Sequence, residues 1–263
     1  MTRVRPAAVA GTFYPDHPAT LAAMVDGFVR DAGPPPSADA PPVAVIAPHA
    51  GYVYSGPTAG HAYAQLVPWR DAFDRVVLVG VPHRAPVHGL ALCSADEWAT
   101  PLGNIEVDLM ASTDLLVHRG AVVDDRAHAR EHSLEVHLPF LQRVLAPGWR
   151  LLPVIAGGAD TVSIADLLGP WWSAPRTLVV VSTDLSHYHQ QTEAQRLDRA
   201  TADDIVHARW EGLDGNRACG ASGVRAALEL TRRHHQHVQL LDLRTSADTA
   251  GPDDRVVGYG SFA

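Results

Sequence analysis

Four short runs of β-branched and aliphatic residues constrain the fold of this chain more than any other feature. The runs lie at 43–47, 75–80, 150–157 and 177–182. Each is continuously apolar rather than alternating, which is typical of strands covered on both faces, as in a parallel sheet between helices. Two later segments, 238–246 and 254–262, are predicted to be strands that return at the edge of that sheet.

Segments with helical spacing of apolar residues separate these runs. The expected helices lie at 19–32, 57–67, 108–117, 134–146, 161–168, 193–210 and 221–234. This alternation predicts an α/β fold with a central, mostly parallel or mixed sheet that is flanked by helices on both faces. The stretch 33–42 contains five prolines, so we expect a surface loop there. Because that loop is short and leads directly into a strand, we expect a single domain over residues 1–263.

The charge balance narrows the classes of function. The formal net charge is -8, from 21 basic and 29 acidic residues, and the basic residues form no block. This argues against a nucleic-acid partner, whose footprint is a basic stripe. No apolar run approaches the ~18 residues of a membrane-spanning helix, and the N-terminal segment lacks the apolar core of a signal peptide. With only two cysteines, Cys93 and Cys219, a reducing cytoplasm is the expected location.

Histidines recur just beyond the ends of the predicted strands. His49 follows the first run and His83 follows the second, while Asp184 and His187 follow the run at 177–182. In open α/β sheets, ligands bind beyond the carboxyl ends of the strands, where such loops meet. A lone histidine there would most simply be a hydrogen-bonded loop residue. Three of them predict a shared site, because imidazole is the commonest metal ligand and also a base near neutral pH.

The two cysteines differ in their surroundings. Cys219 lies at the start of the helix expected at 221–234. A helix N-terminus lowers the pKa of a thiol, which favours a role for Cys219 as nucleophile or metal ligand. Cys93 lies in an apolar stretch and fits a small buried residue better.

A second group of titratable residues lies at 127–142. His128 and His132 have the i,i+4 spacing that places two ligands on one face of a helix, although the HExxH motif is absent. Two roles remain open for this segment. Ser133 can cap the following helix, with Glu135 in its first turn. Alternatively, Glu131 or His132 can orient the metal site from the side.

The sequence lacks the common nucleotide-binding and hydrolase motifs. It contains no GxGxxG, no Walker A loop and no GxSxG. Ser186 has no elbow glycines, so a Ser-His-Asp hydrolase has no anchor. A metal-free hydrolase that uses Cys219 and His187 is a weaker hypothesis.

Several ordered motifs resemble those of the Memo family, whose bacterial and archaeal members are called AmmeMemoRadiSam system protein B. The motifs are RPAAVAGTFYP, PHAGYVYSGPTAGHAY, VVLVGVPH, TPLGNIEVD, EHSLEVHLPFLQ, STDLSHY, ACG and VVGYGSF. The resemblance runs from about Arg5 to Phe262. It implies a fold similar to that of class III extradiol dioxygenases of the LigB type, which use non-haem iron.

The resemblance also implies roles for individual residues. His49, His83 and Cys219 match the metal ligands of the family. His187 matches the histidine that LigB-type enzymes use as acid and base, and Asp184 accompanies it in the pocket. The usual GPSH motif is GVPH here, with Val81 and Pro82 changed beside the ligand.

Two imidazoles and a thiolate form a mixed nitrogen and sulfur ligand set, which favours iron, copper or zinc over magnesium or calcium. Three protein ligands leave a position open, as catalytic sites do. We therefore expect an iron- or copper-dependent oxidoreductase that acts with O2, with His187 moving protons. LigB-type enzymes use a carboxylate where Cys219 would stand, which separates this site from a true dioxygenase. The alternative is a non-catalytic module that handles metal or binds a peptide.

The substrate is expected to be a small molecule or a peptide, with Tyr54, Tyr188 and Trp98 as candidate walls of its pocket. The family name implies an association with AMMECR1-like and radical SAM partner proteins.

Overall fold

The four apolar runs form the parallel centre of one large sheet in a computed structural model, which describes residues 2–35 and 39–263. In spatial order, these strands are β2 (Ala44–Ala47), β9 (Thr177–Ser182), β3 (Arg75–Gly80) and β8 (Arg150–Gly157). All three pairings between them are parallel, with Ile46 opposite Val181 and Val181 opposite Val79. Consequently, the carboxyl ends of the four strands lie along one edge.

Antiparallel and short strands extend this sheet on both sides. Beyond β2 lie β12 (Val256–Phe262) and β10 (His187–His189), with β11 (Leu240–Thr245) paired to β12. Beyond β8 lie β4 (Gly89–Leu92) and β7 (Val122–Val123). A separate small sheet contains β1 (Val4–Arg5), β5 (Glu97–Thr100) and β6 (Gly103–Glu106). The central sheet is therefore mixed, with a parallel core.

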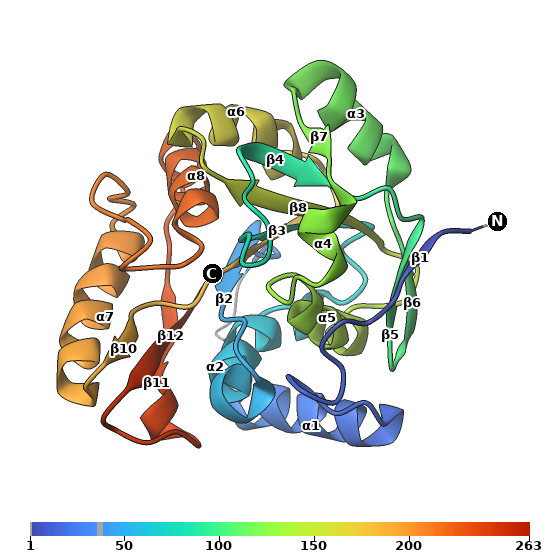
Figure 1. The fold of residues 1–263 in the computed structure, drawn as a ribbon. Helices are drawn as coiled ribbons and strands as arrows, with labels where there is room; N and C mark the ends of the chain where they lie inside the picture. The colour runs from blue at the N-terminus through green and yellow to red at the C-terminus, as the bar shows by residue number, and fades with distance from the viewer. Residues whose placement is uncertain (1, 36–38) are drawn as a thin grey trace.

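Helices cover both faces of the sheet (Figure 1). One group contains α1 (Pro18–Asp31), α2 (Tyr52–Ala64) and α5 (Leu138–Val144). The other contains α6 (Thr161–Trp172) and α8 (Ala221–Arg233), while α7 (Gln191–Val206) packs on β10, β11 and β12. Shorter elements are α3 (Leu109–Arg119), α4 (Asp125–Ala129), η1 (Val67–Trp69), η2 (Glu135–His137) and η3 (Ser246–Asp248). Each face of the sheet has its own buried apolar cluster.

The predicted α/β fold is confirmed, and the boundary of one helix was wrong. Helix α2 begins at Tyr52 rather than at residue 57, so Pro57 lies inside it. Proline there removes the N–H that would bond the carbonyl of Val53, and Val53 is exposed enough for water to replace that bond. As a result, His49 is separated from α2 by only two residues.

Two further predictions were incomplete. The helix expected at 134–146 divides into η2 and α5, with Pro139 in the first turn of α5. The strands β4 to β7 were not predicted, because segments of two to four residues are too short to show a periodic pattern. Residues 36–38 of the predicted proline-rich loop lie outside the described residues. Within the described chain, no helix combines the length and apolarity needed to cross a membrane.

Candidate metal site

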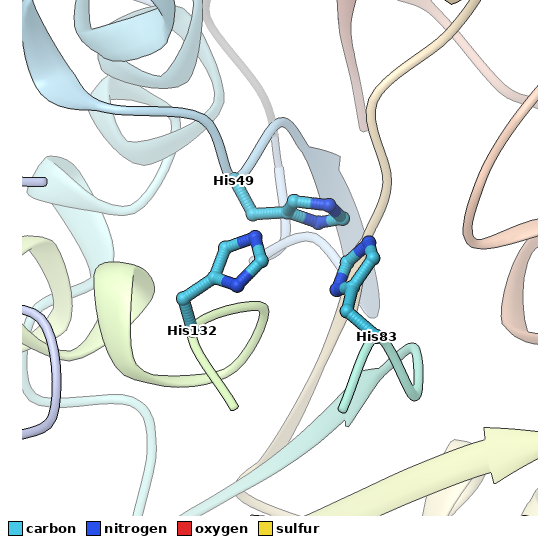
Figure 2. Close-up of side chains that lie close together, drawn as sticks. All are labelled: His49, His83 and His132. Atoms are coloured by element: carbon cyan, nitrogen blue, oxygen red, sulfur yellow. The ribbon is translucent and has the colours of Figure 1, made fainter. Parts of the chain in front are cut away.

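Three imidazoles meet where the central strands end (Figure 2). His49 follows β2, His83 follows β3, and His132 comes from the loop between α4 and η2. Their ligand nitrogens all lie within 4.8 Å of one another. The His83 and His132 rings stack with centroids 4.5 Å apart, and His49 lies edge-on to both. Among the described residues, these three histidines are the group that could hold a metal ion.

A chain of hydrogen bonds fixes the orientation of His49. The Ser182 hydroxyl donates to the carbonyl of Ser133 at 2.6 Å, so its oxygen is left to accept from Nδ1 of His49, also at 2.6 Å. The network therefore assigns the proton of the neutral imidazole to Nδ1 and leaves the lone pair on Nε2. Burial lowers the pKa of His49 well below 6.5, and the neighbouring histidines lower it further. His49 is thus a neutral ring whose Nε2 carries the lone pair that a metal could bind.

Glu131 orients His83 in a similar way. Its carboxylate accepts from Nδ1 of His83 at 2.8 Å and from the backbone N–H of His83 at 2.7 Å. Burial alone would raise the pKa of Glu131, but hydrogen bonds from His83 and from the N–H of Ser133 outweigh it and lower the pKa to about 2. An ionised carboxylate on Nδ1 keeps Nε2 of His83 available to a metal.

His132 is the third imidazole of the group. Its Nδ1 is buried and has no hydrogen-bond partner among the described residues, although it lies 3.4 Å from Oε1 of Glu131. Burial lowers the pKa of His132 to about 4, so the ring is neutral near pH 7. Phe13 packs against its other side at 4.6 Å between centroids. The same Glu131 oxygen thus faces Nδ1 of both His83 and His132.

Cys219 lies beside this group and contacts His49. Its Sγ lies 3.3 Å from Nε2 of His49, and it also accepts from the N–H of Asp184 at 3.2 Å. Gly220 permits this approach, because a Cβ at that position would lie 2.3 Å from the carbonyl oxygen of Ser182. The structure therefore brings His49 and Cys219 together, and it places His132 rather than Cys219 within the cluster of three imidazoles.

The predicted lowering of the Cys219 pKa was wrong. Helix α8 begins at Ala221 with Gly220 as its N-cap, so Cys219 lies just outside it. Burial, reinforced by the charge of Asp184, raises the pKa of the thiol to about 12. Cys219 is consequently a neutral thiol unless a cation stabilises the thiolate.

Asp184 lies beside the same cluster. Its Oδ1 accepts the backbone N–H of His49 at 2.8 Å, and its Oδ2 lies 3.9 Å from Nε2 of His49. Burial raises the pKa of Asp184 to about 7, against the effect of the hydrogen bond from His49. Near neutral pH, this carboxyl exchanges a proton at little cost, as a general acid or base must.

His187 completes the set of groups that can move a proton. Its Nδ1 donates to the carbonyl of Leu185 at 2.8 Å, which leaves Nε2 as an acceptor. Burial lowers the pKa of His187, partly offset by that hydrogen bond. His187 therefore presents a neutral basic nitrogen.

One cavity of about 820 Å³ joins these groups. The predicted site residues that line it are His49, His83, His132, Asp184, His187, Cys219, Tyr54 and Tyr188. The volume is in the range of small-molecule sites.

Trp98 does not line this cavity, so its expected role as a wall was wrong. It is fully buried, and its indole N–H donates to Sγ of Cys93 at 3.2 Å. Cys93 is buried, as expected, and burial raises its pKa.

The predicted helical pair of His128 and His132 does not form. Helix α4 ends at Ala129, and His128 turns away to the carbonyl of Ala91. Capping by Ser133 was also wrong, because its hydroxyl bonds the backbone of Val81 and supports the loop that carries His83. The alternative that Glu131 orients the site agrees with its contacts to His83.

Two contributors escaped the sequence reasoning. Ser182 is the last residue of β9, where the sequence pattern predicts only a strand. Its hydroxyl nevertheless fixes the orientation of the His49 ring. Arg255 lines the cavity from the start of β12, and no local pattern in the sequence pointed to it.

Comparison with known proteins covers nearly the whole chain. Residues 5–263 match a family model described as Memo-like protein. The chain is 34% identical to a MEMO1 family protein of Desulfurococcus amylolyticus, over 97% of this chain and 96% of the relative. It is also 34% identical to a MEMO1 family protein of Methanopyrus kandleri over 98% of both chains. Another MEMO1 family protein, from Archaeoglobus fulgidus, is 34% identical over 97% of both chains.

Proposed function

Since the chain belongs to the Memo family, we propose that it binds one iron or copper ion and acts with O2 as an oxidoreductase on a small or peptide substrate. The convergence of His49, His83 and His132, with Cys219 against His49, carries this proposal. The donor set fits iron, copper or zinc, because it consists of imidazoles and a thiol rather than carboxylates. When bound, iron or copper would supply one-electron chemistry with O2.

His49 and His83 would hold the ion through Nε2, because both Nδ1 atoms are engaged elsewhere. Cys219 and His132 compete for the third place. Cys219 has the support of the family resemblance, whereas His132 has a ligand nitrogen within 4.8 Å of those of His49 and His83. A cysteine ligand also requires a free thiol, which the reducing cytoplasm would maintain.

The remaining groups would handle protons and substrate. His187 would accept a proton at Nε2, since its Nδ1 donates to Leu185. Asp184 would donate or accept a proton near neutral pH, because burial raises its pKa to about 7. Both line the cavity in which a substrate would lie beside the imidazoles.

The non-catalytic alternative uses the same residues. A module that stores or transfers metal needs the ligands but not His187, whereas an oxidoreductase needs both. The hydrolase alternative has less support, because Cys219 contacts His49 and burial opposes formation of its thiolate.

Metal content and O2 uptake test these functions together. We expect about one iron or copper ion per chain, its loss in His49→Ala, and its retention in a matched variant of an exposed histidine, His237→Ala. O2 consumption with a substrate panel would support an oxidoreductase, and its loss in His187→Ala would support the assigned base. Stable metal binding without turnover would favour the metal-handling module. A folded protein that binds neither metal would overturn both.

The pH dependence of metal binding separates the two candidate third ligands. Cys219 is protonated without metal, so its use as a ligand releases one proton. Affinity for zinc, a redox-silent probe, should then rise about tenfold per pH unit between roughly pH 7 and 9. His132 is already neutral there and releases none. A slope that disappears in Cys219→Ala assigns Cys219, and the absence of a slope in the wild type assigns His132.

A further inference from the structure

The mouth of the metal-site cavity carries an arginine that no acidic side chain neutralises. Arg255 lies just before β12, is exposed, and lines the cavity. Across the described part of the chain, no ion pair joins it to a carboxylate. Asp253 and Asp254 precede it in sequence, but neither lines the cavity. Arg255 therefore brings a guanidinium without a carboxylate partner to the lining of this cavity.

An unusual backbone conformation brings Tyr188 to the same position. Its φ is +63°, in the left-handed region that a bulky residue rarely adopts. Pairing between β10 and β12 shifts register between His187 and His189. Side chains of a regular strand alternate between faces, yet His187, Tyr188 and His189 all line this cavity. The irregularity therefore turns three consecutive side chains toward one space, as bulges beside binding sites do.

Tyr188 then supports Arg255. The guanidinium carbon lies 5.0 Å from the centre of the Tyr188 ring, a cation–π contact. This contact orients the guanidinium without neutralising its charge, so its N–H groups remain free for an anion. Guanidinium groups bind carboxylates and phosphates through paired, charge-assisted hydrogen bonds.

The rest of the cavity lining is also favourable to an anion. Among its lining residues, the single carboxyl is Asp184, which is buried beside the metal-site imidazoles. The other titratable groups with basic nitrogens are His49, His83, His132, His187 and His189. The lining of the cavity therefore has one carboxyl against five imidazoles and one guanidinium, on a protein that is acidic overall. Such a contrast attracts an anionic ligand and repels a cationic one.

We propose that Arg255, held over Tyr188, binds an oxyanion of the substrate at the mouth of the cavity, and that the substrate is a small carboxylate or phosphate ester. This rests on the proposed function, since the anchored molecule would extend toward the imidazoles. It assigns Arg255 to substrate selection, because an anion held at the mouth positions the rest of the molecule inside.

Calorimetric titration of the full-length protein tests the proposal, both as purified and after removal of metal by a chelator. The probes are benzoate, its uncharged counterpart benzamide, and inorganic phosphate, at constant ionic strength. Arg255→Gln should weaken binding of the preferred oxyanion about tenfold and leave benzamide unchanged. Arg199→Gln is the matched control, because Arg199 is an exposed arginine outside the cavity lining. A preference for benzoate identifies a carboxylate, and a preference for phosphate identifies a phosphate ester.

Two results would overturn the proposal: equal oxyanion affinity in the wild type and Arg255→Gln, or no binding of either oxyanion to the wild type. Its failure can be distinguished from failure of the metal site. Arg255→Gln should retain the metal content of the wild type, whereas His49→Ala should lose metal and still bind the oxyanion through Arg255.

Discussion

Two glutamates in the segment EHSLEVH are equally buried and serve different regions of the molecule. Glu131 and Glu135 are both 0% exposed, and each accepts several hydrogen bonds. Glu131 binds the side chain and backbone of His83. Glu135 instead accepts from Arg5 and Tyr14, each at 2.6 Å, and from the N–H groups of two residues between them. One carboxylate faces the candidate metal site, and the other fastens the N-terminal segment.

The difference lies in what the partners do next. Glu131 acts on the site through His83, because it fixes one ring nitrogen while the second points into the cluster of imidazoles. The partners of Glu135 instead support the fold. The guanidinium carbon of Arg5, for example, lies 4.1 Å from the centre of the Trp98 ring. The regions still touch, since Arg5 donates to the carbonyl of Glu131 at 2.8 Å. Burial alone therefore does not show whether a carboxylate serves the site. The evidence is whether its partner has a second atom that faces the site, as His83 does.

Replacement of Glu135 should have the largest effect on stability. Glu135→Gln leaves Arg5 buried without a carboxylate, at a cost of about 3–5 kcal/mol in the free energy of unfolding. Urea unfolding of the metal-free protein measures this loss. Metal content of the folded fraction should remain that of the wild type. A loss below about 1 kcal/mol would contradict the assignment of this pair as the fastening of the N-terminal segment.

Replacement of Glu131 should act mainly on metal binding. Glu131→Gln presents one amide group to N–H donors that need acceptors, so the His83 ring loses its fixed orientation. We expect metal affinity to fall about tenfold to a hundredfold, or about 1.4–2.7 kcal/mol. Competition with a chelator measures the affinity, with Glu135→Gln as the matched control. Equal metal affinity in the two variants would remove the distinction between the regions.

Much of the scaffold was predictable from local sequence, because short, continuous apolar runs rich in β-branched residues are typical of strands that are covered on both faces. The strand-exit rule placed His49 and His83 at the same edge for the same reason. The start of α2 was not predictable, since proline is unfavourable inside a helix. The helix accommodates Pro57 because the carbonyl that loses its partner belongs to Val53, which is exposed to water. The apolar pattern of the sequence determined the strands, and access of water to one carbonyl determined the start of α2.

The contacts of the site depend on long-range packing that local patterns do not contain. The segment around Glu131 allowed either a helix cap at Ser133 or a residue that orients the site, because its local sequence is compatible with both. Only the family resemblance indicates that Cys219 is a metal ligand rather than a nucleophile. The raised pKa of its thiol follows from burial among residues distant in sequence. Arg255 meets Tyr188 through an irregular register between two strands, which no periodicity reveals.

A third glutamate, Glu193 in the first turn of α7, tests whether burial explains the difference in stability. It pairs with Arg196 at 2.7 Å, and the two side chains are 47% and 67% exposed. Water solvates both groups when the pair is broken, so Glu193→Gln should change the free energy of unfolding by less than about 1 kcal/mol. Urea unfolding at roughly 0.15 M salt, where exposed charges are screened, measures it beside Glu135→Gln. A loss as large as that of Glu135→Gln would show that removal of a charge from an arginine pair, and not its burial, sets the cost.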